Sequence, residues 1–421
     1  MSIELIILII MLSVFALSVF WFKLPSGVAL ALAALIGAVV GGYGVPVRHL
    51  VEGTFGYLDA VLIIATAMIY MKVLEQSGAL GTISYLIMKS LHRWPTMLLI
   101  FIALFVMFPG MMTGLSSACV LTTGALVAPA LLAIGIPSAA VGAFIAVMAV
   151  FGMIAPPINI PVMIIGGGVD MPYIGFEKPL ALASFPLAIV CALYYRIRYV
   201  RAIDIDDVLS RLQGPLHKKH GLKLFIPLLI VVVLMLAVRI FPEYVPDIGI
   251  PFIFLLGSIA GLVTGERFEI WPAAQQAIRG ALPVMAILIG VGMFVQIMTL
   301  TGVRGFLAVS ALKLPPAFLY LGIAVFMPAF GSAYASASVL GVPLVYVFLG
   351  KNEIIVTSAL SLIAGIGDLM PPPMLLCAFA SQIVGEKNQF RILKQCIPMI
   401  ILSLCVGIAM ILFANEVALM Y

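Results

Sequence analysis

The amino-acid sequence predicts an all-α polytopic membrane protein with two inverted repeats, and three observations lead to this fold class. Hydrophobic residues form 64% of the 421-residue chain, charged residues form only 9%, and the mean hydropathy is +1.26. Apolar runs of about 20 residues, the length of a membrane-spanning helix, recur along the chain. Motifs that contain Gly and Pro recur in the same order in the two halves.

The apolar runs predict ten membrane-spanning helices. They cover residues 2–22, 26–44, 56–75, 138–155, 179–195, 224–241, 248–264, 281–300, 354–370 and 395–414. The first run lacks a basic stretch before it, so we expect a retained span rather than a cleaved signal peptide. The five cysteines have no paired spacing, which argues against a disulfide framework or a metal cluster. The net charge of +5 comes from loop residues, and no nucleic-acid surface is expected.

One long polar segment, residues 196–223, divides the chain. Seven of its residues are Lys or Arg, and such a basic loop is typical of the cytoplasmic side of a membrane. We therefore predict a first repeat at 1–200, a cytoplasmic basic loop at 201–222 and a second repeat at 223–421.

The repeat prediction depends on the spacing of helix-breaking motifs. F-G-M-I-A-P-P at 151–157 and I-G-D-L-M-P-P at 366–372 share the positions of their Gly and Pro-Pro residues, with an offset of 215. Pro129 and Pro343 differ by 214, and Phe108-Pro109 and Met327-Pro328 differ by 219. Upstream, residues 52–78 resemble residues 279–302. Four features in one order indicate a duplication.

Each half contains a segment that differs from an ordinary span. Residues at about 97–134 and about 316–349 consist of two apolar arms around a turn rich in Gly, Ser and Thr. Arms of about a dozen residues measure roughly 18 Å as helix, which is short of a bilayer core of about 30 Å. We therefore predict re-entrant hairpins, with a kinked pair of close-packed helices as the alternative. Residues 78–93 and 302–314 are predicted to be surface arms or short helices.

The distribution of basic residues supports an antiparallel arrangement of the repeats. With the basic loop inside, 16 of the 22 Lys and Arg residues fall on the inner side and 6 on the outer side. Both termini are then expected to be external. Inverted repeats with broken helices are typical of secondary transporters, and the absence of a Walker motif argues against ATP use.

Broken helices offer groups that bind ions. The N-terminus of a half-helix attracts anions, whereas free carbonyl and hydroxyl oxygens suit Na⁺. We expect the Pro-Pro pairs to free carbonyls near Gly152 and Gly367. The predicted sodium ligands are Ser116, Ser117, Gly152, Asn159, Ser332, Ser336, Gly367 and Asp368. The predicted substrate-binding residues are Thr113, Gly114, Thr122, Thr123 and Ser338.

Three acidic residues in or near spans have specific expectations. An acid inside a membrane span is a functional hypothesis, so Asp368 is interpreted as a ligand of Na⁺, as a coupling proton site, or as a helix cap in the hairpin turn. Asp59 is expected to mark the membrane edge of its helix. Glu75 is three residues from Lys72, and the two are expected to pair at the inner boundary.

The motifs resemble a known family. G152-M-I-A-P-P, with the upstream T-G-L-S-S-A-C-V-L-T-T-G, is similar to the large membrane subunit (DctM-like) of tripartite ATP-independent periplasmic (TRAP) transporters, and G367-D-L-M-P-P fits the second such motif. The resemblance implies an elevator fold, Na⁺ as the coupling ion, an organic acid substrate, a small membrane subunit (DctQ-like), a periplasmic binding protein and a bacterial or archaeal cytoplasmic membrane. It also implies sodium sites at Ser116, Ser117, Ser332 and Ser336, with Gly152 and Gly367.

Two departures from the family pattern bear on the substrate. Ile158-Asn159 stands where the family usually has Ser directly after Pro-Pro. Neither hairpin contains Lys or Arg, so an organic anion would depend on backbone amides and Na⁺.

Other functions are weighed against this one. A stand-alone Na⁺/carboxylate symporter and a cation/proton antiporter of the same superfamily are the main alternatives. G365-I-G-D368 also fits the G-x-G-D pattern of intramembrane aspartyl proteases. Such an enzyme needs a second nearby carboxylate, and the candidate Asp59 lies about 300 residues away in a Tyr-x-Asp context. We therefore expect no enzymatic activity.

Overall fold

The computed structural model describes residues 2–200, 209, 216–241, 244, 246, 248–313, 315–371 and 373–419. Over these residues the chain is helical, apart from an isolated bridge between Leu349 and Lys351. Six helices are long and apolar enough to cross a membrane, or seven if the bent pair α3 and α4 forms one span. All ten predicted spans correspond to helices, which confirms the all-α prediction. Those at 2–22, 26–44, 138–155 and 248–264 form shorter apolar helices, so the structure does not bear out ten full-length spans. Most of the predicted loop at 201–222, and also Pro372, lie outside the described residues.

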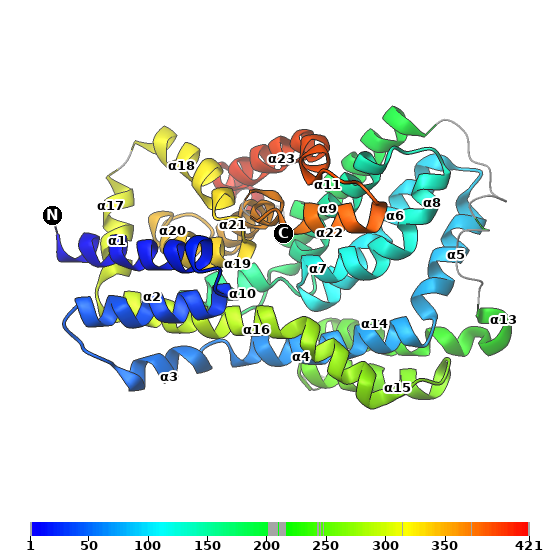
Figure 1. The fold of residues 1–421 in the computed structure, drawn as a ribbon, viewed down its shortest axis with the longest axis horizontal. Coiled ribbons are helices and arrows are strands. Elements are labelled where there is room, and N and C mark those ends of the chain that lie inside the picture. The colour runs from blue at the N-terminus through cyan, green and yellow to red at the C-terminus, as the bar shows by residue number, and fades with distance from the viewer. Residues whose placement is uncertain are drawn as a thin grey trace.

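The helices pack in two layers (Figure 1). The lower layer contains α1 (Ile3–Ala16), η1 (Leu17–Trp21), α2 (Ser26–Val40), α3 (Val47–Phe55), α4 (Leu58–Gln76), α13 (His217–His220), η3 (Gly221–Phe225), α14 (Ile226–Ile240), α15 (Ile250–Thr264) and α16 (Ile270–Leu300). The predicted span at 281–300 is therefore too short, because α16 begins at Ile270 and includes the polar residues before Pro283.

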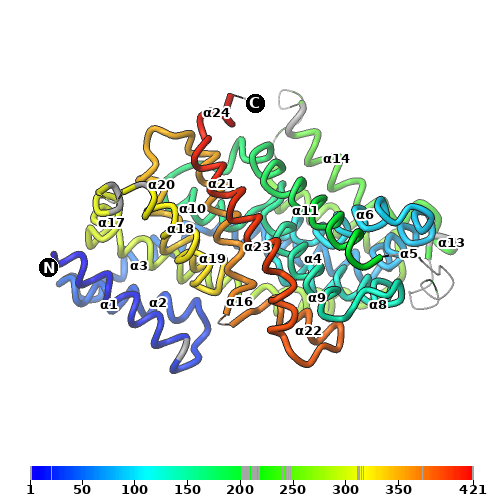
Figure 2. The backbone as a smooth tube through the Cα atoms, turned by 90° about the horizontal axis from the view of Figure 1, so that it is seen from above, coloured from blue at the N-terminus to red at the C-terminus, as the bar shows by residue number. Residues whose placement is uncertain are grey.

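The upper layer holds the two hairpins and the broken helices. Its elements are α6 (Pro95–Thr113), α7 (Ser116–Cys119), η2 (Val120–Gly124), α8 (Ala125–Ala133), α9 (Ser138–Ile154), α10 (Ile160–Gly168), α11 (Glu177–Tyr199), α18 (Pro316–Ala329), α19 (Ala333–Ser336), η4 (Ala337–Gly341), α20 (Val342–Val347), α21 (Glu353–Gly365), η5 (Ile366–Leu369), α22 (Leu375–Val384), α23 (Gln389–Leu412) and α24 (Ala414–Ala418). In Figure 2, α23 crosses the middle of the molecule beside α21.

Two short helices connect the layers. α5 (Ala79–Leu91) follows α4 and leads to the first hairpin, and α17 (Val303–Leu312) follows α16 and leads to the second. Both lie where the sequence predicts surface arms or short helices. Arg304 of α17 packs over the ring of Tyr346 in α20, at 4.9 Å from the ring centre, so this arm contacts the second hairpin directly.

Backbone-to-backbone contact holds the lower layer together. A Cβ atom on Gly27 of α2 would lie 2.3 Å from the carbonyl oxygen of Ala286 in α16, and one on Gly53 of α3 would lie 2.4 Å from that of Gly292. These positions accept only glycine without displacement of a helix, because protein interiors are close-packed. The three helices therefore pack as one tight unit.

The arms of the first hairpin are longer than predicted. α6 has 19 residues, and the stretch Ser116–Ala133 has 18, so the expectation of arms of about a dozen residues is wrong here. Pro109 lies inside α6 and does not end it, because a proline removes one backbone hydrogen bond that packing can offset. The turn of the hairpin is consequently narrow, at Gly114 and Leu115. Both arms are long enough to cross a membrane, so the length argument for a re-entrant first hairpin does not hold.

Polar contacts outside the spans fix the end of the basic loop. Lys219 Nζ lies 2.6 Å and His220 Nε2 lies 3.0 Å from Glu266 Oε1, in the turn after α15. The hydrogen bond from Lys219 is the main cause that holds the pKa of Glu266 below its usual range.

In α4, Lys72 Nζ lies 3.0 Å from Glu75 Oε1, so the predicted pairing of these two residues is confirmed.

Candidate functional site

The tips of both hairpins meet at Asp368. Its Oδ2 accepts a hydrogen bond from the Ser116 hydroxyl at 2.6 Å, and its Oδ1 accepts one from the Ala333 backbone amide at 2.9 Å. Ser116 is the first residue of α7 and Ala333 the first residue of α19. One carboxylate therefore binds the starts of two helices that lie far apart in the sequence, and it is only 3% exposed.

Local sequence explains why the tips can approach Asp368. Gly114 (φ +68°) and Gly331 (φ +64°) adopt the left-handed conformation that ends one arm of each hairpin and that glycine tolerates best. Asp368 lies in the short η5 turn that follows α21. Next to it, a Cβ atom on Gly367 would lie 3.3 Å from the backbone of Ser332, so glycine permits the second tip to come this close.

A tyrosine forms a further contact between the hairpins. The hydroxyl of Tyr334 in α19 donates to the carbonyl oxygen of Gly114 in the first turn at 3.1 Å. Tyr334 is buried. Together with the two hydrogen bonds to Asp368, this contact fixes the positions of the two hairpin tips relative to each other.

Asn159 closes the break between α9 and α10. Its Oδ1 accepts from the Val162 amide at 2.9 Å, which caps α10, and its Nδ2 donates to the Ile154 carbonyl at 2.9 Å. The same Nδ2 lies 3.1 Å from the Ser361 hydroxyl in α21. The carbonyl at the end of α9 is therefore bonded, and Asn159 links the first broken helix to the second.

The glycines that precede the two breaks differ in their surroundings. The Gly152 carbonyl accepts from the Ala155 amide at 3.3 Å, and the Gly367 carbonyl accepts from the Met370 amide at 3.0 Å. The expectation that the breaks free these two carbonyls is therefore wrong. Each oxygen retains a second lone pair. A Cβ atom on Gly152 would lie 2.5 Å from the Met107 carbonyl oxygen, so α9 packs closely against α6 at this point.

The predicted substrate-binding hydroxyls bond mainly to the backbone of their own hairpin. Thr113 donates to the Pro109 carbonyl at 2.7 Å, and Thr122 donates to the Ala118 carbonyl at 2.6 Å. Thr123 bonds to the carbonyls of Val106 and Cys119. Ser338 donates to the Ala335 carbonyl at 2.9 Å. These donors stabilise the hairpins, and their oxygens retain acceptor capacity.

Four further hydroxyl oxygens of the hairpins and of α21 have no partner or only a weak one among the described residues. Ser336 in α19 and Thr357 in α21 have buried hydroxyls with no hydrogen-bond partner among the described residues. The side chain of Ser117 forms no hydrogen bond with any described residue. The hydroxyl of Ser332 accepts a long hydrogen bond of 3.5 Å from the Ala335 amide. A buried hydroxyl without a partner is costly, which makes the oxygens of Ser336 and Thr357 candidates for an additional ligand.

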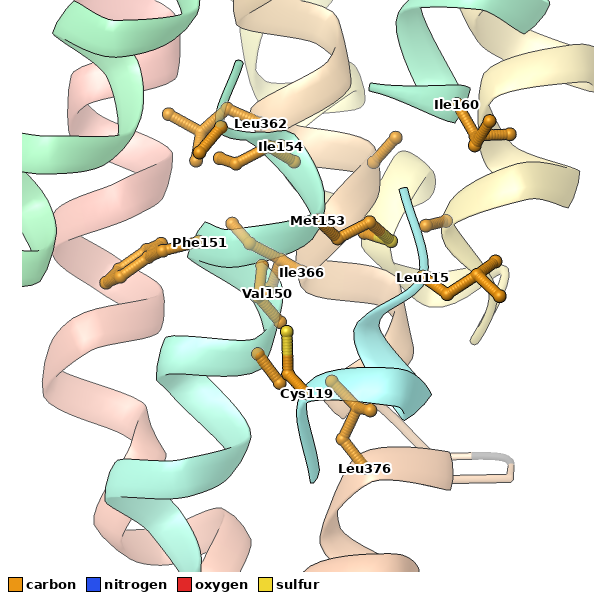
Figure 3. Close-up of a cluster of buried hydrophobic side chains, with 14 of the residues drawn as sticks. Leu115, Cys119, Val150, Phe151, Met153, Ile154, Ile160, Leu362, Ile366 and Leu376 are labelled. Carbon is orange, nitrogen blue, oxygen red and sulfur yellow. The ribbon is translucent and has the colours of Figure 1, made fainter. Parts of the chain in front are cut away.

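An apolar shell surrounds the first tip. Leu115 and Cys119 lie against Val150 and Met153 of α9, while Ile366 and Leu376 approach from the second broken helix (Figure 3). Asp368 forms no ion pair with any residue that the structure describes. Its buried carboxylate is therefore held by neutral donors.

Part of this site could be predicted from the sequence. The predicted sodium ligands include Ser116 and Asp368, which the structure joins. The predicted substrate-binding residues Thr122, Thr123 and Ser338 lie one to two helical turns away from the tips. The sequence prediction missed Tyr334, Ser361 and Thr357. The one available signal was that each is a polar residue in a run that is otherwise small or apolar. The part of the chain described has no cluster of three His, Cys, Asp or Glu residues suited to a metal.

Comparison with known proteins identifies the fold. The chain is similar to the crystal structure of the YdaH transporter of Alcanivorax borkumensis, reported to have an unusual topology, with a TM-score of 0.63 and 18% sequence identity over 92% of this chain and 97% of that chain. No protein-family model matches the sequence, and no curated protein matches it. The chain therefore has the fold of a helical, polytopic membrane protein of which a known transporter is an example.

Proposed function

We propose that the protein is a secondary transporter in which the two hairpin tips and the two broken helices form one cation-coupled site. The observation that carries this proposal is the convergence of Ser116 and the Ala333 amide on buried Asp368. Helices interrupted near the middle of the membrane, with their ends directed at one point, are the usual construction of such sites. The likeness in fold to the YdaH transporter supports a transport function.

The coupling ion is proposed to be Na⁺, bound near Asp368. A buried carboxylate that has only neutral donors needs a bound cation or a proton to offset its loss of hydration. The hydroxyl oxygens of Ser117, Ser332 and Ser336 are of the type that Na⁺ binds, and that of Ser336 has no hydrogen-bond partner among the described residues. Occupation of Asp368 by a proton is the second candidate, and it is favoured by the 2.6 Å separation of Asp368 Oδ2 and Ser116 Oγ.

The substrate is proposed to be a small organic acid. The N-terminal ends of the returning arms, at Ser116 and at Ala333, carry partial positive charge toward the site, and such ends stabilise an anion in the absence of Lys or Arg. In this proposal the halves are inverted repeats, and the upper layer moves as an elevator against the lower layer. Both hairpins support this view, because each returns through four α-helical residues followed by five π-helical residues.

The resemblance in motifs further supports the role of a large permease subunit of a TRAP transporter. In that role the chain lies in a bacterial or archaeal cytoplasmic membrane and works with a small membrane subunit and a periplasmic binding protein. A stand-alone symporter would need neither partner. Uptake by the purified chain alone, compared with uptake after addition of both partners, separates these two forms.

Thermal unfolding of the purified chain tests the coupling ion without knowledge of the substrate. The Tm is expected to rise when NaCl replaces KCl at equal ionic strength, since a ligand that binds only the folded state adds about 2.7 kcal/mol at 100 times its Kd. In vesicles, uptake of radiolabelled carboxylic acids should require an inward Na⁺ gradient and no ATP. A Tm that is equal in both salts, with uptake that follows a pH gradient, would assign the coupling to protons instead.

A further inference from the structure

A cavity of about 480 Å³ lies away from the hairpin tips, between the two layers. The lower layer contributes the start of α4 and the start of α15, and the upper layer contributes α10 and the loop at 171–176. Ligand-binding cavities commonly measure roughly 300–1,000 Å³, so this one can hold a small organic molecule. None of the predicted site residues lines it.

Aromatic rings form much of its wall. Tyr173 and Phe176 are stacked with ring centres 5.5 Å apart and planes at 10°. The hydroxyl of Tyr57 donates to the Ile164 carbonyl at 2.9 Å, and that of Tyr173 donates to the Pro157 carbonyl at 3.0 Å. Because both hydroxyls are bonded to the backbone, the tyrosines offer the cavity mainly ring surface.

Asp59 supplies the charge of the cavity. Among the described residues that line the cavity, it is the one with an acidic or basic side chain. No hydrogen bond or ion pair joins its carboxylate to another described residue. Two basic residues of neighbouring helices bond to other groups: Arg48 pairs with Glu52 at 2.7 Å, and Arg304 bonds to Tyr346 and Thr299. The prediction that Asp59 only marks a membrane edge gives no account of its position in this wall.

We propose that this cavity is a binding site for an organic cation, with a quaternary or primary ammonium group between Asp59 and the aromatic rings. A cation gains both from the carboxylate and from the faces of aromatic rings, whereas an anion would meet an unpaired negative charge. Met163 and Ile63 would contact the apolar part of the ligand. The proposal concerns a second site and does not depend on transport through Asp368.

Direct binding to the full chain in dodecyl maltoside, measured by calorimetry in KCl, tests the proposal. Benzyltrimethylammonium is the probe, with benzyl alcohol and phenylacetate as neutral and anionic compounds of similar size. We expect saturable binding of the cation alone. Asp59→Asn should raise its Kd at least about tenfold, which corresponds to about 1.4 kcal/mol. The matched control is Asp170→Asn, an exposed acid in the adjoining loop that does not line the cavity, and it should leave the Kd within about twofold.

A second variant separates loss of binding from loss of folding. Met163→Trp fills the cavity from the α10 side, leaves Asp59 in place and is expected to abolish binding of the cation. Equal binding of benzyl alcohol would overturn the proposal in favour of an apolar site for lipid or detergent chains. Preference for phenylacetate, an unchanged Kd in Asp59→Asn, or no saturable binding would overturn it as well. A failure of the proposed Na⁺ coupling would leave all these results unchanged.

Discussion

At the scale of single residues, Asp368 carries the candidate site. Sequence could select it, because an acid inside an apolar run has a high cost in lipid and persists only for a reason. Sequence could not show its partners, since Ser116 lies 252 residues away and Ala333 contributes only a backbone amide. Sequence could not select Tyr334 for a related reason. Its hydroxyl bonds to a backbone carbonyl of the other hairpin, and no local sequence pattern indicates such a contact.

The charge of Asp368 can be removed while both of its hydrogen bonds are kept. In Asp368→Asn, Oδ1 can still accept from the Ala333 amide and the new Nδ2 can donate to the Ser116 hydroxyl. We expect this variant to keep its stability in KCl within about 1 kcal/mol and to lose the rise in Tm caused by NaCl. Asp368→Ala should instead cost about 1–3 kcal/mol in both salts, because it leaves buried donors without acceptors.

These Asp368 variants distinguish a sodium ligand from a helix cap and from a proton site. If the Tm and the transport of the Asp368→Asn variant respond to Na⁺ and to pH as in the wild type, Asp368 acts only as a cap that joins the hairpin tips. If the response to pH alone disappears, Asp368 is the proton site. Glu353→Gln, at the start of the α21 helix that η5 follows, is a suitable control for the loss of one acidic residue.

At the scale of elements, the sequence predicted which helices exist better than where they end. The breaks at Pro156-Pro157 and before Pro371 were found because prolines cannot continue a helix through the required hydrogen bonds. Pro109 was interpreted in the same way, yet α6 continues for four residues beyond it. The difference is tertiary: Gly110 packs against Cys119 and Gly152, so the helix past Pro109 is held from outside.

This packing predicts opposite effects for two Gly→Ala substitutions. In Gly152→Ala the added methyl would meet the Met107 carbonyl, so we expect a loss of about 1–3 kcal/mol and a lower Tm. In Gly305→Ala, within α17, the methyl enters open space, and the better helix propensity of alanine should stabilise by up to about 1 kcal/mol. Thermal unfolding of the two variants in parallel provides the measurement. Equal shifts in Tm would show that close approach of α6 and α9 does not determine stability here.

At the scale of the whole molecule, the sequence predicted the composition of the fold but not its layers. Hydropathy reports that a helix is apolar, and lipid and protein contact are equally apolar, so it cannot assign neighbours. The division of the chain at 196–223 remains a prediction, because half of that segment lies outside the described residues. The packing of α2, α3 and α16 through Gly27, Gly53 and Gly292 depends on backbone contacts that become visible only in three dimensions.

That packing leads to a prediction about movement. Within the lower layer, backbone contacts between helices leave no room for sliding, because interiors of this density do not deform continuously. The two layers, by contrast, are linked by the short arms α5 and α17 and are separated in part by the cavity at α4 and α10. If the protein works as an elevator, the upper layer moves as a body while the lower layer stays fixed.

Spin labels at exposed positions can measure this displacement. One pair joins Leu282 of α16 to Phe390 of α23, across the layers, and the control pair joins Leu282 to Val39 of α2, within the lower layer. In the purified chain we expect two distance populations for the first pair, with a ratio that changes when Na⁺ replaces K⁺, and one unchanged population for the control. A ligand shifts such an equilibrium only by binding one state more tightly than the other. A single distance for both pairs in both salts would mean that the layers form one rigid body, and the elevator mechanism would then be wrong.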